Sequence, residues 1–348
     1  MAISDWVHDQ ARKANRNLLL VNGIILALLL CFVAVQGRYF YNFILGSQKI
    51  EPAELVRPTS PSQRSRNFVT VQGEKSVLTG YQEVVRKINK ATRQVVSTEV
   101  KAEYAFLKVQ DKLLLVKARP GAARLEYSGA LTPVPADFQQ DYLKSLLAER
   151  PQLAGRILPF ELDATEYLNT GITFLILGLP LGALAIWNCG KALRRSSNEA
   201  TLPGLATLAA YGNVDQLSME IETERKLQKE RYGDLEVTQS WIMRRSLFSL
   251  WLCPVHDLAW AYKKVTKHSV YFIPTGKTFA VILAGGRRQR VEVNMPEPLA
   301  NQLLTTLAAR APWAIFGFSA DIEKAWRKKT QAFLDMVAER KRKYAGPA

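Results

Sequence analysis

Two stretches of the chain are almost entirely apolar and contain no Asp, Glu, Lys, Arg or His: residues 18–36 and 168–187. A helix that crosses a membrane needs about 20 mostly apolar residues, because backbone groups have no hydrogen-bond partner in hydrocarbon except each other. Both stretches reach that length. We therefore predict transmembrane helices over residues 18–36 and 168–188, with a cytoplasmic N-terminus (1–17), a middle segment (38–167) and a C-terminal segment (189–348).

A cleaved signal peptide is the alternative for the first stretch. Signal peptides have an apolar core of about 7–15 residues followed by a small-residue cleavage site. The stretch from Leu18 to Gln36 is longer than this core, and no clear A-x-A site follows it. We therefore favour an uncleaved membrane anchor.

Charges beside the two stretches predict their orientation, because Lys and Arg are retained on the cytoplasmic side. Three basic residues precede the first stretch: Arg12, Lys13 and Arg16. Three acidic residues precede the second stretch and three basic residues follow it: Glu161, Asp163 and Glu166, then Lys191, Arg194 and Arg195. Both patterns predict an integral inner-membrane protein with cytoplasmic termini and residues 38–167 outside.

Small and polar residues inside the apolar stretches suggest helix packing. Gly178 and Gly182 form a small-xxx-small pair in the second stretch, with Pro180 between them. Such pairs let another helix approach closely, so we expect packing against the first stretch or against a second copy in a homo-oligomer. Asn22 is expected to form a helix–helix hydrogen bond. Two helices without a buried charge make a transporter improbable.

The middle segment is predicted to be a small α+β module over residues 67–167, after a linker over 38–66 whose last part is rich in Pro, Ser and charge. Val84, Ile88, Ala91 and Val95 have helical spacing, so we expect an amphipathic helix there. The runs AEYAFLKVQ, LLLVKAR and RLEYSGALTPV follow, separated by turn residues, and predict an antiparallel meander. Phe138, Tyr142 and Leu146 then predict a second helix.

The C-terminal segment begins with a juxtamembrane helical part, residues 189–233, where Asn213 and Gln216 have the spacing of a capping box. From Asp234 onward, short runs rich in β-branched and aromatic residues predict a curved antiparallel sheet or partial barrel of five to seven strands. Leu299, Leu303 and Leu307 predict a helix after the sheet. WAIFGFS reads as a final strand. A last amphipathic helix is expected from the spacing of Ile322, Trp326, Phe333 and Val337.

The text EVTQSWIM followed by LCPVHDLAWAY resembles the bacterial variety of pleckstrin-homology domain, over residues 234–310. That resemblance implies an antiparallel sheet closed by a helix, within a domain over residues 234–348. The run HDLAWAYKKVTKHSVYFIPTGKT, placed after two spans and a middle segment without cysteine, is similar to a family of functionally unassigned two-pass bacterial membrane proteins. The resemblance implies an architecture and no activity.

The excess of positive charge lies mainly in the C-terminal part. The chain has a net charge of +16, and residues 168–348 contain 25 basic and 15 acidic residues. For a membrane protein the nearest anion is the inner leaflet, which attracts each nearby Lys or Arg by about 1 kcal/mol. We therefore expect anionic lipid headgroups as the partner and no nucleic acid. The candidate anion-binding residues are Lys263, Lys264, Lys267, Lys277, Arg287, Arg288 and Arg290. A solvated surface is the alternative, and strand alternation would place Lys263 and Lys264 on opposite faces.

Catalytic and cofactor motifs are missing from the sequence. Thr275–Thr278 matches the end of a P-loop, but Tyr271 occupies the position of the required glycine; we interpret Pro274–Gly276 as a hairpin turn. His256 and His268 lie 12 residues apart with Asp257 as the nearby carboxylate, which leaves a metal site without a third ligand. The middle segment has no cysteine and no histidine. We therefore expect no cofactor and no metal.

Three functions fit these observations. The first is a non-catalytic two-pass membrane protein whose cytoplasmic domain binds anionic lipid or a protein partner and is coupled to the extracytoplasmic module. The second is a structural subunit of a larger envelope complex, with Gly178 and Gly182 as a contact face. The third is a membrane-bound hydrolase or transferase with dispersed residues such as His256, Asp257 and His268.

Overall fold

The computed structural model describes residues 6–57, 61, 64–89, 92–270 and 273–345. Two of its helical stretches are long and apolar enough to cross a membrane: Trp6–Val35 and Asn169–Ser197. The chain divides into two compact units. We call residues 26–183 the central unit and residues 1–25 with 184–348 the terminal unit.

The first apolar stretch lies in helix α1 (Trp6–Val35), which extends beyond the predicted span at its N-terminal end and is followed by α2 (Gly37–Leu45). The second lies in α6 (Asn169–Thr173), a π-helical turn (Phe174–Gly178) and α7 (Leu179–Ser197). Proline lacks a backbone N–H and disturbs the preceding turn, and π-bulges commonly mark such sites. Pro180 therefore accounts for the change of helical type at this point.

The central unit is built on a seven-stranded sheet with the order β1-β2-β6-β7-β5-β4-β3. The strands are β1 (Gln48–Lys49), β2 (Phe68–Gln72), β3 (Lys75–Ile88), β4 (Val95–Val109), β5 (Lys112–Ala118), β6 (Glu126–Pro133) and β7 (Ile157–Asp163). The pairs β1–β2 and β5–β7 are parallel, and the other pairs are antiparallel. The antiparallel character was predicted, but the simple meander was wrong, because β7 lies between β5 and β6.

Each face of this sheet has its own core. One face buries Leu107, Leu114, Val116 and Leu162 together with Leu55 of helix α3 (Pro52–Leu55). The other buries Tyr104, Leu115 and Phe138 under the helical segment α4 (Ala136–Phe138), a π-helical turn (Gln139–Leu143) and α5 (Lys144–Glu149). The predicted helix at Phe138 is confirmed. The predicted linker over 38–66 is wrong in part, since α2 lies in it and Leu55 is fully buried.

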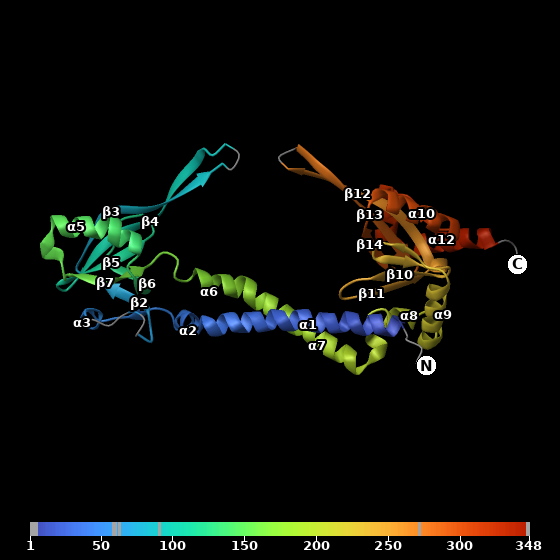
Figure 1. Ribbon diagram of the computed structural model, residues 1–348, viewed down its shortest axis with the longest axis horizontal. Coiled ribbons are helices and arrows are strands. Elements are labelled where there is room, and N and C mark those ends of the chain that lie inside the picture. Colours follow the sequence, from blue (N-terminus) through green and yellow to red (C-terminus); the bar gives the residue numbers. More distant parts are fainter. Residues whose placement is uncertain (1–5, 58–60, 62–63, 90–91, 271–272, 346–348) are drawn as a thin grey trace. The chain divides into compact units, whose positions relative to one another are not determined.

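The predicted helix over Val84–Val95 is wrong. These residues belong to the paired ends of β3 and β4, where Val84 lies opposite Val100 and Ile88 opposite Val95. Ala91 lies outside the described residues. β5 pairs with β4 only from Glu103 onward, so the ends of β3 and β4 form a two-stranded ribbon that projects from the sheet (Figure 1). Val84, Val85, Ile88, Val95 and Val96 are exposed on this ribbon.

The terminal unit contains two antiparallel sheets. The first has the order β11-β10-β9-β8 and consists of β8 (Glu230–Tyr232), β9 (Leu235–Val237), β10 (Trp241–Arg245) and β11 (Leu250–Pro254). The second has the order β14-β13-β12-β15, with β12 (Leu258–Val270), β13 (Ile273–Gly285), β14 (Arg290–Asn294) and a short parallel strand β15 (Ile315–Phe316). Most of the strands predicted after Asp234 are present, but they form two sheets where one was expected, and β8 lies within the predicted helical part over 189–233. Pro274–Gly276 lie in β13 and form no hairpin turn.

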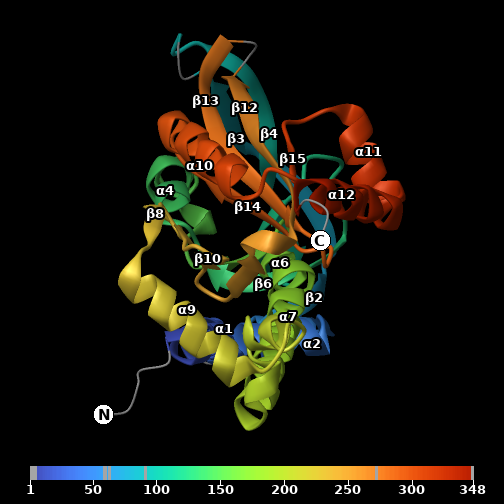
Figure 2. The ribbon, with the colours of Figure 1, turned by 90° about the vertical axis from the view of Figure 1, so that its right-hand side faces the viewer.

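Helices cover both faces of the second sheet (Figure 2). On one face α10 (Glu297–Arg310) buries Ala300, Leu303 and Leu307 in a core shared with the first sheet. On the other face Trp260 packs against Trp326 of α11 (Ala320–Lys328) and Phe333 of α12 (Thr330–Ala345). The single last helix expected from the sequence is therefore two helices, interrupted at Lys329.

The start of α1 belongs to the core of the terminal unit. Val7 and Ala11 pack with α8 (Leu205–Leu208), α9 (Val214–Leu227) and the sheet β8–β11. Asn213 caps α9 by accepting a hydrogen bond from the Gln216 backbone N–H at 3.1 Å, as its sequence position predicts. The N-terminal residues and the C-terminal domain are therefore one folding unit.

Candidate functional site

The seven predicted basic residues are distributed over two strands and the β13–β14 turn. Lys263 and Lys264 emerge from β12 on opposite faces and are ion-paired. Lys263 Nζ lies 2.7 Å from Glu297 Oε1, and Lys264 Nζ lies 2.9 Å from Glu292 Oε1. Their charges are therefore largely balanced by α10 and β14.

The arginines at the other end of the sheet have structural contacts. Arg290 donates to the Tyr262 hydroxyl at 2.6 Å and lies 3.5 Å from Glu323. Arg287 lies 4.3 Å from the centre of the Tyr211 ring and donates to the Ala210 carbonyl. Arg288 is exposed and has a left-handed backbone with φ 60°. The structure thus separates these arginines from the lysines at the far end of β12 and β13.

Lys267 and Lys277 are the two predicted residues that the fold brings together. They lie directly opposite each other on β12 and β13. β14 pairs with β13 only over Ala280–Ala284, so this part of the hairpin is a two-stranded ribbon, exposed on both faces (Figure 1). We call residues 265–269 with 276–278 the basic ribbon. Among the described residues, neither lysine has an ion-pair partner.

The two histidines of the enzyme hypothesis are far apart. His256 lies immediately before β12, and His268 lies near the other end of that strand, where its Nε2 is 3.0 Å from Thr278 Oγ1. Twelve strand residues span about 40 Å at about 3.3 Å each. Asp257 accepts a hydrogen bond from the Tyr211 hydroxyl at 2.7 Å. Within the described parts of the chain, no three His, Cys, Asp or Glu side chains are arranged to hold a metal ion.

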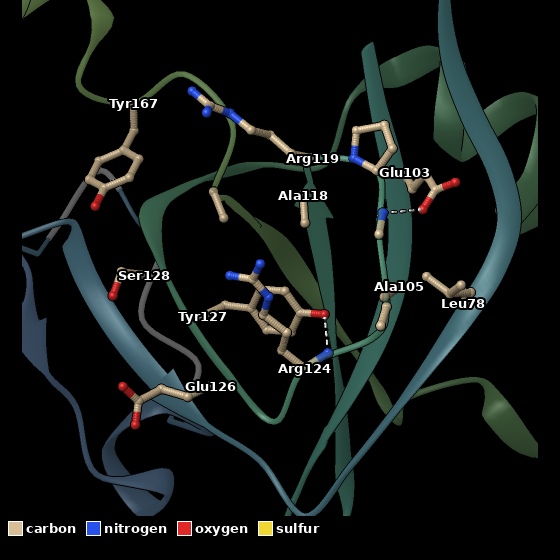
Figure 3. A pocket seen from close by; sticks show the side chains of 14 residues that line it. Leu78, Glu103, Ala105, Ala118, Arg119, Arg124, Glu126, Tyr127, Ser128 and Tyr167 are labelled. Atoms are coloured by element: carbon tan, nitrogen blue, oxygen red, sulfur yellow. Dashed lines mark hydrogen bonds between the residues drawn. The ribbon is translucent and has the colours of Figure 1, made fainter. Parts of the chain in front are cut away.

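Sequence analysis missed a cavity of about 460 Å³ in the central unit. The loop between β5 and β6 frames it, strands β3 and β4 form one wall, and the segment after β7 forms another (Figure 3). Its charged and hydroxylated lining residues are Glu103, Arg119, Arg124, Glu126, Tyr127, Ser128 and Tyr167. The loop sequence RPGAARL carried the signal, because two arginines flank small residues that allow close approach.

The carboxylates of this cavity already have partners. Glu103 Oε2 accepts the Gly121 backbone N–H at 3.1 Å, and its Oε1 accepts the Gln82 amide at 2.8 Å (Figure 3 shows the first bond). Glu126 lies 4.0 Å from Lys49 Nζ. Arg119 and Arg124 have no ion-pair partner among the described residues. Arg119, Arg124 and the nearby Lys49 are three cations against the two carboxylates Glu103 and Glu126, so the cavity and its rim carry a net charge of +1.

A buried carboxyl group, that of Glu161 on β7, lies in the sheet of the central unit. Glu161 is 3% exposed, and its Oε2 has no hydrogen-bond partner among the described residues. Burial and, to a smaller extent, the neighbouring Asp163 raise the pKa of Glu161 to about 7, although Lys117 and the Thr132 hydrogen bond act in the opposite direction. Lys117 is bonded to Glu83, 2.5 Å away, and this bond lowers the pKa of Glu83. This face therefore contains a carboxyl group that titrates near neutrality.

Two of the residues noted in the sequence, Gly182 and Asn22, lie where the apolar helices contact each other. In the central unit, a Cβ on Gly182 would lie 3.5 Å from Leu29 of α1, and a Cβ on Gly178 would meet Phe174 of its own helix. In the terminal unit, Asn188 donates to Asn22 Oδ1 at 3.2 Å. The predicted interhelical hydrogen bond of Asn22 is thus confirmed.

Comparison with protein families gives one match. Residues 214–326 match a domain of unknown function (DUF6709). This range runs from the start of α9 into α11 and contains all seven predicted basic residues, whereas the cavity residues lie outside it. No curated protein matches the chain. The match is consistent with the uncharacterised family expected from the sequence, and it identifies neither a pleckstrin-homology domain nor a membrane-protein family.

Proposed function

We propose that this chain is a non-catalytic two-pass inner-membrane protein whose C-terminal domain faces the cytoplasm and binds anionic lipid headgroups. The proposed orientation follows from the acids before α6 and the basic residues Lys191, Arg194 and Arg195 in α7. In this orientation residues 38–167 lie outside. The basic C-terminal domain then lies on the side of the anionic leaflet.

A pleckstrin-homology-like fold is part of this proposal. The strands β8–β11 and β12–β14 form two antiparallel sheets, and α10 closes the core between them. The resemblance at EVTQSWIM and LCPVHDLAWAY implies an antiparallel sheet closed by a helix, and the packing of α10 on these strands supports the proposal. The match to a domain of unknown function covers the same elements.

The observation that carries the lipid proposal is the placement of Lys267 opposite Lys277. Like charges directly opposite on neighbouring strands destabilise a sheet, and these two have no acidic partner among the described residues. An anionic surface would neutralise both, since each Lys near such a surface contributes about 1 kcal/mol. The ion-paired Lys263 and Lys264 are weaker candidates for the same role.

The test uses the full-length chain, because Val7 and Ala11 belong to the core of the terminal unit and a C-terminal fragment would lose them. A fluorophore on Thr266→Cys, with the three native cysteines replaced by serine, reports contact with quencher-labelled lipid in nanodiscs. We expect quenching with phosphatidylglycerol that falls as salt rises and falls in K267Q/K277Q. The control K324Q/K328Q changes two exposed lysines of α11. Absence of quenching at low salt would contradict the lipid proposal and favour a protein partner.

The alternative function, a structural subunit of a larger envelope complex, is favoured by a different observation. Five valine or isoleucine side chains are exposed on the β3–β4 ribbon, and contiguous exposed apolar side chains commonly mark contact surfaces. The mass of the complex extracted in mild detergent tests this alternative. A mass equal to one chain would contradict it.

A further inference from the structure

The cavity of the central unit has the size and composition of a small-molecule site. Its volume of about 460 Å³ lies within the range of about 300–1,000 Å³ that is typical of ligand pockets. Polar groups converge on it from the β5–β6 loop, from β6 and from Tyr167 (Figure 3). Apolar contacts are supplied by Leu78, Ala105 and Ala118.

The charges of the cavity select the ligand class. Glu103 holds the backbone of the β5–β6 loop through Gly121, so its carboxylate fixes the loop that carries Arg119 and Arg124. Both guanidinium groups lack an ion-pair partner among the described residues, and guanidinium binds phosphate and carboxylate oxygens in bidentate geometry. Glu103 and Glu126 also line the cavity, and the net charge of +1 that remains with Lys49 favours an anion over a neutral ligand.

Tyr127 adds a hydrogen-bond donor. Its hydroxyl oxygen accepts the Arg124 backbone N–H at 2.7 Å, and the side chain is 8% exposed. A hydroxyl that accepts from the protein still has its own proton to donate. The same contact orders the chain at Arg124, which reduces the entropy lost when a ligand binds.

We propose that this cavity binds a small oxyanion through the guanidinium groups of Arg119 and Arg124, and a phosphate monoester is the simplest example. A phosphate monoester carries a charge of about −1.5 to −2 at pH 7 and three acceptor oxygens, so one such group can pair with Arg119 and Arg124 together. The proposal is independent of the lipid-binding proposal, because it concerns the other unit of the chain.

The cavity lies next to the start of the second apolar helix. Ala164 and Tyr167 line the cavity, and α6 begins two residues later at Asn169. The Tyr167 ring packs edge-on against Phe68, and its backbone carbonyl accepts from the Tyr39 hydroxyl at 2.8 Å. A bound anion therefore contacts the segment that joins the sheet to the second apolar helix.

Hydrogen exchange of residues 119–128 tests this proposal with the full-length chain in phosphatidylcholine nanodiscs. The probes are inorganic phosphate and glycerol 3-phosphate, each compared with sodium chloride of equal ionic strength. We expect at least one probe to slow exchange about tenfold at ten times its dissociation constant. R119Q/R124Q should abolish the effect. The control R150Q/R156Q removes two exposed arginines of the same unit outside the cavity and should retain it.

A phosphate group can come from a soluble ligand or from a lipid headgroup, and a second arm separates them. In this arm the nanodiscs contain phosphatidic acid and no probe is added. Slower exchange that is lost in R119Q/R124Q would assign the site to a lipid headgroup. Protection that needs a soluble probe would assign it to a soluble phosphate ester. The proposal would be overturned if neither the probes nor phosphatidic acid slowed exchange, or if exchange slowed equally in R119Q/R124Q.

Discussion

Lys267 and Lys277 are direct cross-strand partners on the basic ribbon. Replacing Lys267 by Glu converts this repulsive pair into an attractive one, which stabilises a strand pair by about 0.2–1 kcal/mol. The same change should weaken contact with an anionic leaflet, since each positive charge removed costs about 1 kcal/mol of attraction. K267E should therefore slow hydrogen exchange of the ribbon and reduce lipid quenching. K324E is the control. Faster hydrogen exchange of the ribbon together with reduced lipid quenching would show that K267E damages the ribbon, and would contradict this prediction.

Glu161 should make the central unit less stable as the pH rises. Its carboxyl group has a pKa of about 7 in the folded chain and an ordinary value of 4.5, so the folded state binds more protons between these values. The free energy of unfolding should fall by about 1.4 kcal/mol for each pH unit of this window. E161Q should remove the fall, whereas E149Q, at an exposed glutamate of α5, should preserve it. Protection factors of the β7 amides measure both, and an unchanged pH profile in E161Q would contradict this assignment.

Gly171 should tolerate no larger side chain where α6 meets α2. A Cβ at this position would lie 2.3 Å from the Phe43 ring. G171A should destabilise the central unit by about 1–3 kcal/mol, as overpacking does. G190A is the control, because no atom lies within 4 Å of a Cβ there. Thermal unfolding in detergent measures both variants. Adding F43A should restore part of the loss if the clash is the cause.

Asn22 and Asn188 should be energetically coupled. Their hydrogen bond joins the two apolar helices, and such bonds in membrane proteins contribute about 0.6 kcal/mol on average. A double-mutant cycle of N22A and N188A should give a coupling free energy of this size. Additive effects of the two substitutions would show that the bond contributes nothing.

The sequence predicted secondary structure correctly where one hydrophobic pattern continued over many residues. The two apolar stretches, the helices at Asn213 and Leu299, and most of the strands after Asp234 were predicted, although the division of these strands into two sheets was not. Val84 and Ile88 misled, because a spacing of four residues fits both a helix and alternate positions of a strand. The run of β-branched residues around them favours strands. β7 was missed, since its pairing with β5 and β6 depends on contacts distant in sequence.

The candidate sites show the same limit. Strand alternation correctly placed Lys263 and Lys264 on opposite faces, as their separate partners Glu297 and Glu292 show. It gave no means to know that Lys267 would face Lys277, which depends on the register of β12 and β13. The sequence did not predict Arg119 and Arg124 as site residues, because the loop that contains them borders a cavity only when β3, β4 and the segment after β7 are folded around it.

The central claim of this account is the two-pass topology with an external central unit and a cytoplasmic C-terminal domain. Single-cysteine variants S97C on β4 and S246C after β10, both at exposed positions, test it directly in a background where Cys31, Cys189 and Cys253 are replaced by serine. A membrane-impermeant thiol reagent added to intact cells should label S97C at once and S246C only after permeabilisation. Labelling of S246C in intact cells, or release of the chain from membranes by alkaline carbonate, would contradict the account.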